Sequence, residues 1–254
     1  MSHGCKTGTL AVLFLAGTLA GCPTRPAPPP AAVRGAPAAA PAAAPAAAHR
    51  GRPYDVASAE SLLTVLVYRA GTLAAAGHNH VIASHTLAGT VYVPDEVRDT
   101  TLEVRVAVDA LTVDEPELRA QQPGGDFPPD VSDSARAGTR RNMLSAALLD
   151  AADHPEIVLR AVGFESDAAG APGMLTAHLE VELRGERHPV AVPVRYEIAG
   201  DTLTVAGAAA IRQSELGLTP FTALLGALAV QDEMRISFRF TCRSHPGDRG
   251  DSPE

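Results

Sequence analysis

The sequence predicts an all-β fold, a closed antiparallel β-barrel of about eight strands with one or two short helices. Apolar and polar residues alternate strictly over four segments, which indicates strands with one buried and one solvated face. These segments are 102–109, 175–184, 190–198 and 234–242. Weaker runs of the same kind lie near 62–70, 86–93, 156–165 and 203–212. Eight strands are enough for a twisted sheet to close into a barrel.

Short turn segments support a meander, in which each strand pairs with the next. Glycine-containing segments at 168–173, 184–186 and 200–201 are short enough for hairpins. We therefore expect successive strands to be neighbours in the sheet.

The N-terminal segment predicts export and a lipid anchor. The apolar run 10–21 follows Lys6 and is too short to cross a bilayer, but it has the length of the apolar part of a signal peptide. It ends in Leu19-Ala20-Gly21-Cys22, a pattern in which small residues precede a cysteine that receives lipid in bacterial lipoproteins. A plain secretory peptide is the alternative. Because Pro23 rather than an aspartate follows, we expect an outer-membrane lipoprotein that faces the periplasm.

Composition divides the chain into four parts. Residues 1–21 are the predicted signal peptide, and residues 22–53 form an Ala/Pro-rich tether that favours extended polyproline II. One β-barrel domain is expected over 54–243, and a disordered tail over 244–254.

Charge and cysteine content exclude several classes of function. With 29 acidic and 21 basic residues the net charge is −8, and no basic stripe is present, so nucleic acid is not an expected partner. Cys5 leaves with the signal peptide and Cys22 is lipidated, so Cys242 has no partner for an intramolecular disulfide. Cys242 lies on the apolar phase of its strand, which predicts a buried thiol.

Two segments have helical rather than strand periodicity. Residues 134–151 carry apolar side chains at helical spacing, which predicts an amphipathic helix. In the second segment, Thr219 is a good N-cap and Pro220 a good first helical residue. One apolar face of that predicted helix comprises Phe221, Leu224, Leu225 and Leu228. A helix at this place must lie over an open end of the barrel or on its outer wall.

The inward phase of the strands gives the candidate lining of a cavity. The lining candidates are Val106, Leu179, Val194, Val205 and Phe238, with Phe221, Leu224, Leu225 and Leu228 from the predicted helix. Gly207 and Ala209 share the phase of Val205, and small residues on an inward face leave space. An eight-stranded barrel is either filled by side chains or holds one small ligand, and both interpretations remain open.

Histidines give an alternative, metal-based interpretation. His78 and His80 lie two residues apart, so on a strand they point to one face and could share a metal ion; His85 is nearby. The other interpretation is a hydrogen-bonded turn that leads into a strand. An acidic segment containing Asp114, Glu115, Glu117, Asp126 and Asp130 lacks the spacing of a calcium loop and is expected to be solvated. No catalytic motif is found, so we expect no enzyme.

Three groups of stretches follow one another along the chain. They are Asn142-Met143-Leu144 with His154-Pro155-Glu156-Ile157, then Leu175–Leu179 with Arg184–Val190, and then Ala210–Gly217. In this order they resemble the YceI-like family of lipid-binding, lipocalin-like barrels. Leu216 stands where the family often has Phe, and Leu148-Leu149 replaces a Phe-Phe pair. Gly77-His78-Asn79-His80 is similar to a signature found in part of the family.

The resemblance implies a long apolar tunnel that holds a polyisoprenoid chain such as a quinone tail. We therefore expect an exported lipoprotein that binds or carries an apolar lipid, with the membrane reached through Cys22 and no cofactor other than the bound isoprenoid. The alternatives are a periplasmic metal-binding protein that uses His78 and His80, or a ligand-free structural barrel. The oligomeric state stays open, a dimer included.

Overall fold

The computed structural model describes residues 50–166 and 171–244. The predicted signal peptide, Cys22, most of the predicted tether and nearly all of the predicted tail lie outside these residues. Within them, no helix is long and apolar enough to cross a membrane.

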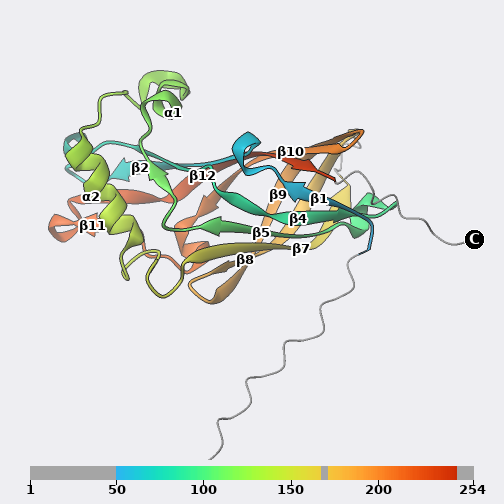
Figure 1. Cartoon of the computed structure of the whole chain (residues 1–254). Helices are drawn as coiled ribbons and strands as arrows, with labels where there is room; N and C mark the ends of the chain where they lie inside the picture. Colours follow the sequence, from blue (N-terminus) through green and yellow to red (C-terminus); the bar gives the residue numbers. More distant parts are fainter. Residues whose placement is uncertain (1–49, 167–170, 245–254) are drawn as a thin grey trace, which may run out of the picture. The chain divides into compact units, whose positions relative to one another are not determined.

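The fold is a closed antiparallel barrel of eight strands, as the sequence predicts (Figure 1). The described strands are β1 (Arg52–Val56), β2 (Leu62–Ala70), β3 (His80–Ser84), β4 (Leu87–Val93), β5 (Thr101–Ala107), β6 (Thr112–Val113), β7 (Glu156–Ser166), β8 (Met174–Leu183), β9 (Glu186–Ala199), β10 (Thr202–Arg212), β11 (Thr222–Ala223) and β12 (Leu228–Arg243). All eight strand segments expected from the alternation are present.

The first three barrel strands are each interrupted. β1 and β2 form the first barrel strand, and both pair with the long strand β12. β3 and β4 form the second, because β4 pairs with β1 and β3 pairs with β2. β5 and β6 form the third, because β5 pairs with β4 and β6 pairs with β3. From β5 the sheet runs through β7, β8, β9 and β10 to β12, and the β1–β12 pairing closes it. Every barrel strand thus pairs with the next one along the chain, which confirms the meander.

A serine hydroxyl replaces ladder hydrogen bonds where the strands are interrupted. Ser58 Oγ donates to the carbonyl oxygen of His85 at 2.7 Å and accepts from the backbone N–H of Leu87 at 3.0 Å. Because these groups are removed from the regular ladder, a side-chain partner keeps them satisfied. The interruptions therefore cost few backbone hydrogen bonds.

The helices and helical turns gather mostly at one end of the barrel, which we call the helical end (Figure 1). The α-helices are α1 (Pro116–Ala120) and α2 (Asp133–Leu144), and the 3-10 turns are η1 (Ser58–Glu60), η2 (Ala74–Ala76), η3 (Val97–Asp99), η4 (Pro123–Gly125), η5 (Gln213–Leu216) and η6 (Leu224–Gly226). The opposite end carries the β4–β5, β7–β8 and β9–β10 connections.

The helix predicted over 134–151 is shorter than expected. Ser132 caps α2 by accepting a hydrogen bond from the backbone N–H of Ala135, and α2 ends at Leu144. The chain then turns back, because the N–H of Leu149 donates to Met143 O and Asp150 adopts a positive φ of 50°. This reversal brings residues after α2 under the end of the barrel instead of extending the helix.

The helix predicted over 219–228 is wrong. Thr222 and Ala223 form β11, which pairs with β12, and the tip of this hairpin is η6. The N–H of Val230 donates to Phe221 O at 3.1 Å across the hairpin. A helix of this length is marginal without a buried face, whereas pairing with β12 satisfies the backbone directly.

Candidate functional site

The barrel encloses an apolar cavity of about 290 Å³. Side chains from every barrel strand line it, and none of them is charged. The polar groups of the lining belong to Thr100, Gln213, Tyr196 and Cys242; the other lining residues are aliphatic or aromatic, with Met at two positions. A cavity of this composition gives water too few hydrogen-bond partners, so it favours an apolar occupant.

The strand residues predicted to line the cavity do so. The five are Val106, Leu179, Val194, Val205 and Phe238. Gly207 does not leave open space as expected, because a Cβ there would lie 2.7 Å from the ring of Phe238. The phenyl ring of Phe238 thus occupies the space that a side chain at position 207 would need. This ring stacks on Phe240 at 4.8 Å between ring centroids.

The four residues assigned to the second helix lie elsewhere. Phe221, Leu224, Leu225 and Leu228 are not among the residues that line the cavity. Leu225 is fully exposed, and Leu224 is 67% exposed. Since the segment is a hairpin rather than a helix, its apolar side chains do not share one inward face.

Residues that the sequence did not mark close the helical end of the cavity. Met143 of α2 and Leu148 and Leu149 of the following turn line the cavity there, together with Leu216 of η5. The apolar spacing after Met143 is the available signal, but that spacing by itself predicts a longer helix.

Two polar side chains lie toward opposite ends of the cavity. Gln213, at the helical end, donates from Nε2 to Gln231 O at 2.7 Å. Thr100, before β5 at the opposite end, is 8% exposed, and its Oγ1 has no hydrogen-bond partner among the described residues. A buried hydroxyl without a partner is costly unless a ligand or water supplies one.

Cys242 also lines the cavity and is buried, as predicted. Burial raises the pKa of its thiol to about 11, and the nearby charge of Asp55 adds to the shift. The thiol is therefore protonated at neutral pH and is a poor nucleophile.

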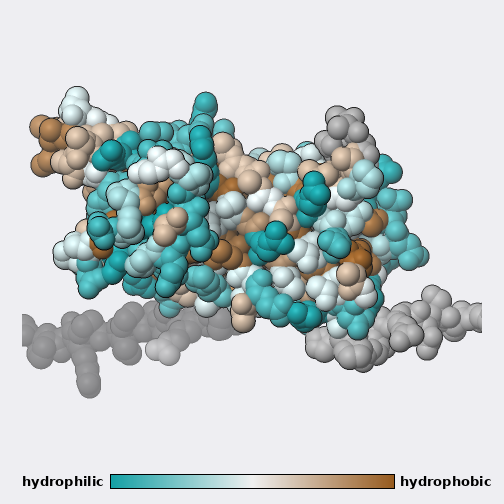
Figure 2. All heavy atoms as spheres, turned by 90° about the horizontal axis from the view of Figure 1, so that it is seen from above, coloured by the Kyte–Doolittle hydropathy of each residue, from teal (hydrophilic) through white to brown (hydrophobic). Residues whose placement is uncertain are grey.

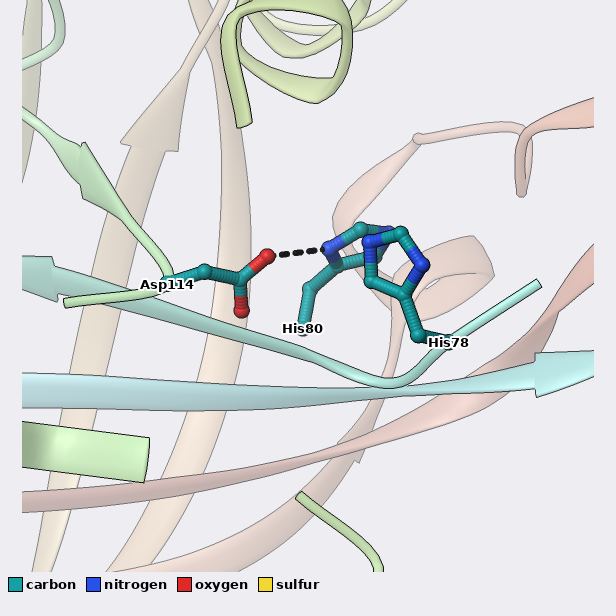
Figure 3. Close-up of side chains that lie close together, drawn as sticks. All are labelled: His78, His80 and Asp114. Carbon is teal, nitrogen blue, oxygen red and sulfur yellow. Dashed lines mark hydrogen bonds and ion pairs between the residues drawn. The ribbon is translucent and has the colours of Figure 1, made fainter. Parts of the chain in front are cut away.

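A second candidate site lies at the helical end, where His78 and His80 meet Asp114 (Figure 3). One ligand atom from each of the three residues lies within 4.8 Å of those of the others. His80 pairs with Val67, a cavity-lining residue, so its side chain is on the inward phase of β3. His80 Nδ1 donates to Asp114 Oδ2 at 2.7 Å, and the two imidazole rings lie 4.6 Å apart.

Asp114 corrects the expectation of a solvated acidic segment. Its side chain is fully buried, and its Oδ1 accepts from Arg119 Nη1 at 2.5 Å and from the N–H of Val81 at 2.8 Å. Arg119 of α1 is also fully buried and donates to the carbonyl oxygens of Asn79 and Pro128. We call His80, Asp114 and Arg119 the buried polar network.

The turn interpretation of the histidine segment is also supported. Asn79 is buried, accepts from the N–H of Arg69 at 2.9 Å, and donates to Asp126 O at 3.0 Å. The side chain of Asn79 therefore satisfies backbone groups where the chain enters β3.

The pKa shifts in this site favour a neutral His78 beside an ionised Asp114. Burial lowers the pKa of His78, and the charges of His80, Arg119 and Arg69 lower it further against the opposing effect of Asp114. Burial raises the pKa of Asp114, but hydrogen bonds from His80, the Val81 N–H and Arg119 outweigh it, so the net pKa is lowered. Nε2 of His78 is buried and has no partner among the described residues.

The sequence of this chain matches a known protein family. A model of the YceI-like domain matches residues 54–242. The chain belongs to the YceI-like family. Curated proteins gave no match.

Solved structures of other proteins are similar to this chain, and that of BcnA shows the same fold. BcnA of Burkholderia cenocepacia is 16% identical, with a TM-score of 0.52, and the match covers 74% of this chain and 99% of BcnA. A polyisoprenoid-binding domain from Saccharophagus degradans is 9% identical, with a TM-score of 0.46, over 76% and 98% of the two chains. The YceI protein of Campylobacter jejuni is 6% identical, with a TM-score of 0.44, over 63% and 82%.

The YceI-like motifs have clear places in this barrel. Leu148 and Leu149, which replace a Phe-Phe pair, and Leu216, which stands where Phe is frequent, all line the cavity. All three side chains are apolar, so these positions contribute to the apolar character of the cavity wall.

Proposed function

We propose that this YceI-like barrel binds one apolar lipid chain, of the polyisoprenoid or isoprenoid-quinone kind, in its cavity. The observation that carries the proposal is a cavity inside the barrel with no charged lining residue. Removing apolar surface from water contributes about 25 cal/mol per Å². A long hydrocarbon chain is thus held with few polar contacts.

The predicted lipid anchor at Cys22 and the tether to residue 53 complete the proposal. They would hold an exported barrel near the outer membrane, on its periplasmic side, where it sequesters or carries the lipid. Membership in a family of binding barrels and the absence of a catalytic motif support a carrier rather than an enzyme.

Bound lipid is tested by organic extraction of the purified protein and mass spectrometry. Val194→Phe, which adds volume to the cavity wall, is expected to lower bound lipid about tenfold. Arg195→Phe is the matched control, because Arg195 is the next residue on β9 and is exposed. Titration with prenyl chains of increasing length gives a second readout. Affinity that does not depend on chain length would contradict lipid binding in the cavity.

Binding of a metal ion is a second candidate function, favoured by the grouping of His78, His80 and Asp114. Two imidazoles and a carboxylate are a frequent donor set for zinc. Zinc added to the protein, followed by calorimetry and elemental analysis, tests it. His78→Ala is expected to abolish binding, and His85→Ala is the control, because His85 is exposed and contacts Glu115 instead. Equal zinc binding by both variants would rule out this site.

A further inference from the structure

The hairpin between β11 and β12 ends in an exposed apolar surface that the barrel does not use. Phe221 is 38%, Leu224 67% and Leu225 109% exposed, and Leu73 of the neighbouring β2–β3 turn is 46% exposed. We call these four residues the leucine tip. Figure 2 shows a brown projection at the end of the domain that carries β11 in Figure 1.

The backbone of the leucine tip is left-handed where leucine is an unfavourable residue. Leu224 and Leu225 have φ values of 51° and 56°, a conformation in which a Cβ crowds the backbone. Within residues 50–166 and 171–244, the other non-glycine residues with a positive φ are Asp114, Asp150 and Arg184, all polar. Glycine or asparagine would form the same turn with less strain and less apolar exposure. Because Leu224 and Leu225 combine a strained backbone with exposed apolar side chains, we infer a functional constraint on these two residues.

Neighbouring backbone holds the leucine tip in place. The N–H of Leu73 donates to Ala227 O at 2.8 Å, and the N–H of Ala227 donates to Leu224 O at 3.2 Å. Gly71 approaches so closely that a Cβ there would lie 2.4 Å from Ala227 O. The projection is therefore braced by the β2–β3 turn and is not a free loop.

We propose that the leucine tip inserts into the surface of a lipid bilayer. Charge attraction does not carry this contact, because the chain has a net charge of −8 and the four side chains are apolar. Burying a few large apolar side chains at the interface gives weak, reversible binding. Such binding complements a covalent anchor, which keeps the domain near the bilayer without fixing its orientation.

The length of chain before the barrel allows this contact. β1 begins at Arg52 at the end of the barrel opposite the leucine tip, and β12 spans roughly 50 Å over its 16 residues. The 29 residues from 23 to 51 are Ala/Pro-rich, and a segment of that length would span roughly 90 Å if it were fully extended as polyproline II. A domain anchored through Cys22 can thus bring the leucine tip to the same bilayer. The contact rests on the proposed anchor at Cys22, and its purpose, exchange of lipid with the barrel, rests in addition on the proposed lipid binding.

A single fluorescent reporter tests insertion in the full lipidated chain. Leu225→Cys gives one accessible thiol, because Cys242 is buried and the predicted anchor occupies Cys22. An environment-sensitive dye at residue 225 is expected to shift to the blue in zwitterionic vesicles and to be quenched by spin-labelled lipid, equally at low and high salt. Ala199→Cys, exposed at the opposite end, is the control and is expected to remain unquenched.

Variants of the leucines provide the decisive comparison. With the dye at Thr222→Cys, the further change Leu225→Asn is expected to lower the inserted-to-free ratio about tenfold. Since asparagine tolerates left-handed backbone, the unfolding midpoint is expected to be unchanged or higher. Unquenched dye at residue 225 would overturn the proposal, and so would a blue shift that grows with protein concentration without vesicles, which would assign the tip to a second copy.

Measuring extracted lipid in the same samples separates the two proposals. An inserted tip on a barrel without lipid contradicts the proposed function and leaves the membrane contact standing. A barrel that keeps its lipid while its tip stays unquenched contradicts the membrane contact alone.

Discussion

The cavity and the buried polar network exclude water from the barrel domain in opposite ways. The cavity does so because its lining has no charge and few polar groups. The network buries a full ion pair, Asp114 with Arg119, and surrounds it with hydrogen bonds from His80 and Val81. The cavity lining tolerates changes of shape, because dispersion contacts are many and individually weak. The buried polar network depends on every partner, because an unpaired buried charge is costly.

The largest effect is expected when the network loses its charge balance. Asp114→Asn keeps the shape of the side chain but leaves Arg119 buried without a counter-charge. We expect a loss of about 3–5 kcal/mol in the free energy of unfolding, measured with urea. Asp130→Asn, in an exposed part of the same acidic segment, is the control. Adding Arg119→Met to Asp114→Asn should cost less than the sum of the two single changes; an additive result would contradict the coupling.

Acid should weaken the network but not the cavity. The pKa of Asp114 is lowered in the folded protein from its usual 3.8, so its stabilising contribution is complete above pH 3.8 and is lost as the pH falls through the folded value. Each unit of depression corresponds to about 1.4 kcal/mol. Urea titrations from about pH 5 to about pH 2 should show a smaller decline in Asp114→Asn than in the wild type. Parallel declines would mean that other carboxyl groups dominate acid unfolding.

Replacing the unpaired hydroxyl of the cavity is expected to stabilise the protein slightly. Thr100→Val removes an Oγ1 that has no partner among the described residues, and the gain should be about 1 kcal/mol in ligand-free protein. If Thr100 contacts a polar head group, the same change should weaken binding of a prenyl alcohol and leave binding of the matching hydrocarbon unaltered. Thermal unfolding and chain titrations measure the two effects. A destabilised variant would show that the hydroxyl is satisfied.

The smallest effect is expected for added volume in the cavity wall. Val205 is partly buried and lines the cavity, so Val205→Leu can extend into open space and should cost less than about 1 kcal/mol. Val108→Leu, at a buried core position that does not line the cavity, is the comparison and should cost more. Equal costs at both positions would show that the wall around Val205 is packed as tightly as the rest of the core.

These contrasts explain which features the sequence revealed. Period-two alternation is local, so the strands and the lining residues Val106, Leu179 and Val194 could be predicted from it. The network joins His80 to Asp114 across 34 residues, and no local pattern links them. Asp114 therefore looked like one of several solvated acids, although Arg119 follows it by only five residues.

The hairpin tip shows a different limit. Phe221, Leu224 and Leu225 have helical spacing, and Thr219-Pro220 resembles a helix start, so the pattern favoured a helix. Spacing predicts one apolar face only when something covers that face. Here the leucines are exposed and the backbone pairs with β12 instead. Apolar residues chosen for contact outside the fold mislead any prediction that assumes a buried core.

The pairing of β1 with β12 has a consequence for biosynthesis. Asp55 lies opposite Arg243 in the ladder, so the barrel wall remains open until the last strand has been synthesised. Contacts between residues so distant in sequence slow folding, because a long loop must close before they contribute. The barrel of a nascent chain therefore stays open on the ribosome, and the order of the strands delays its closure until β12 has been synthesised.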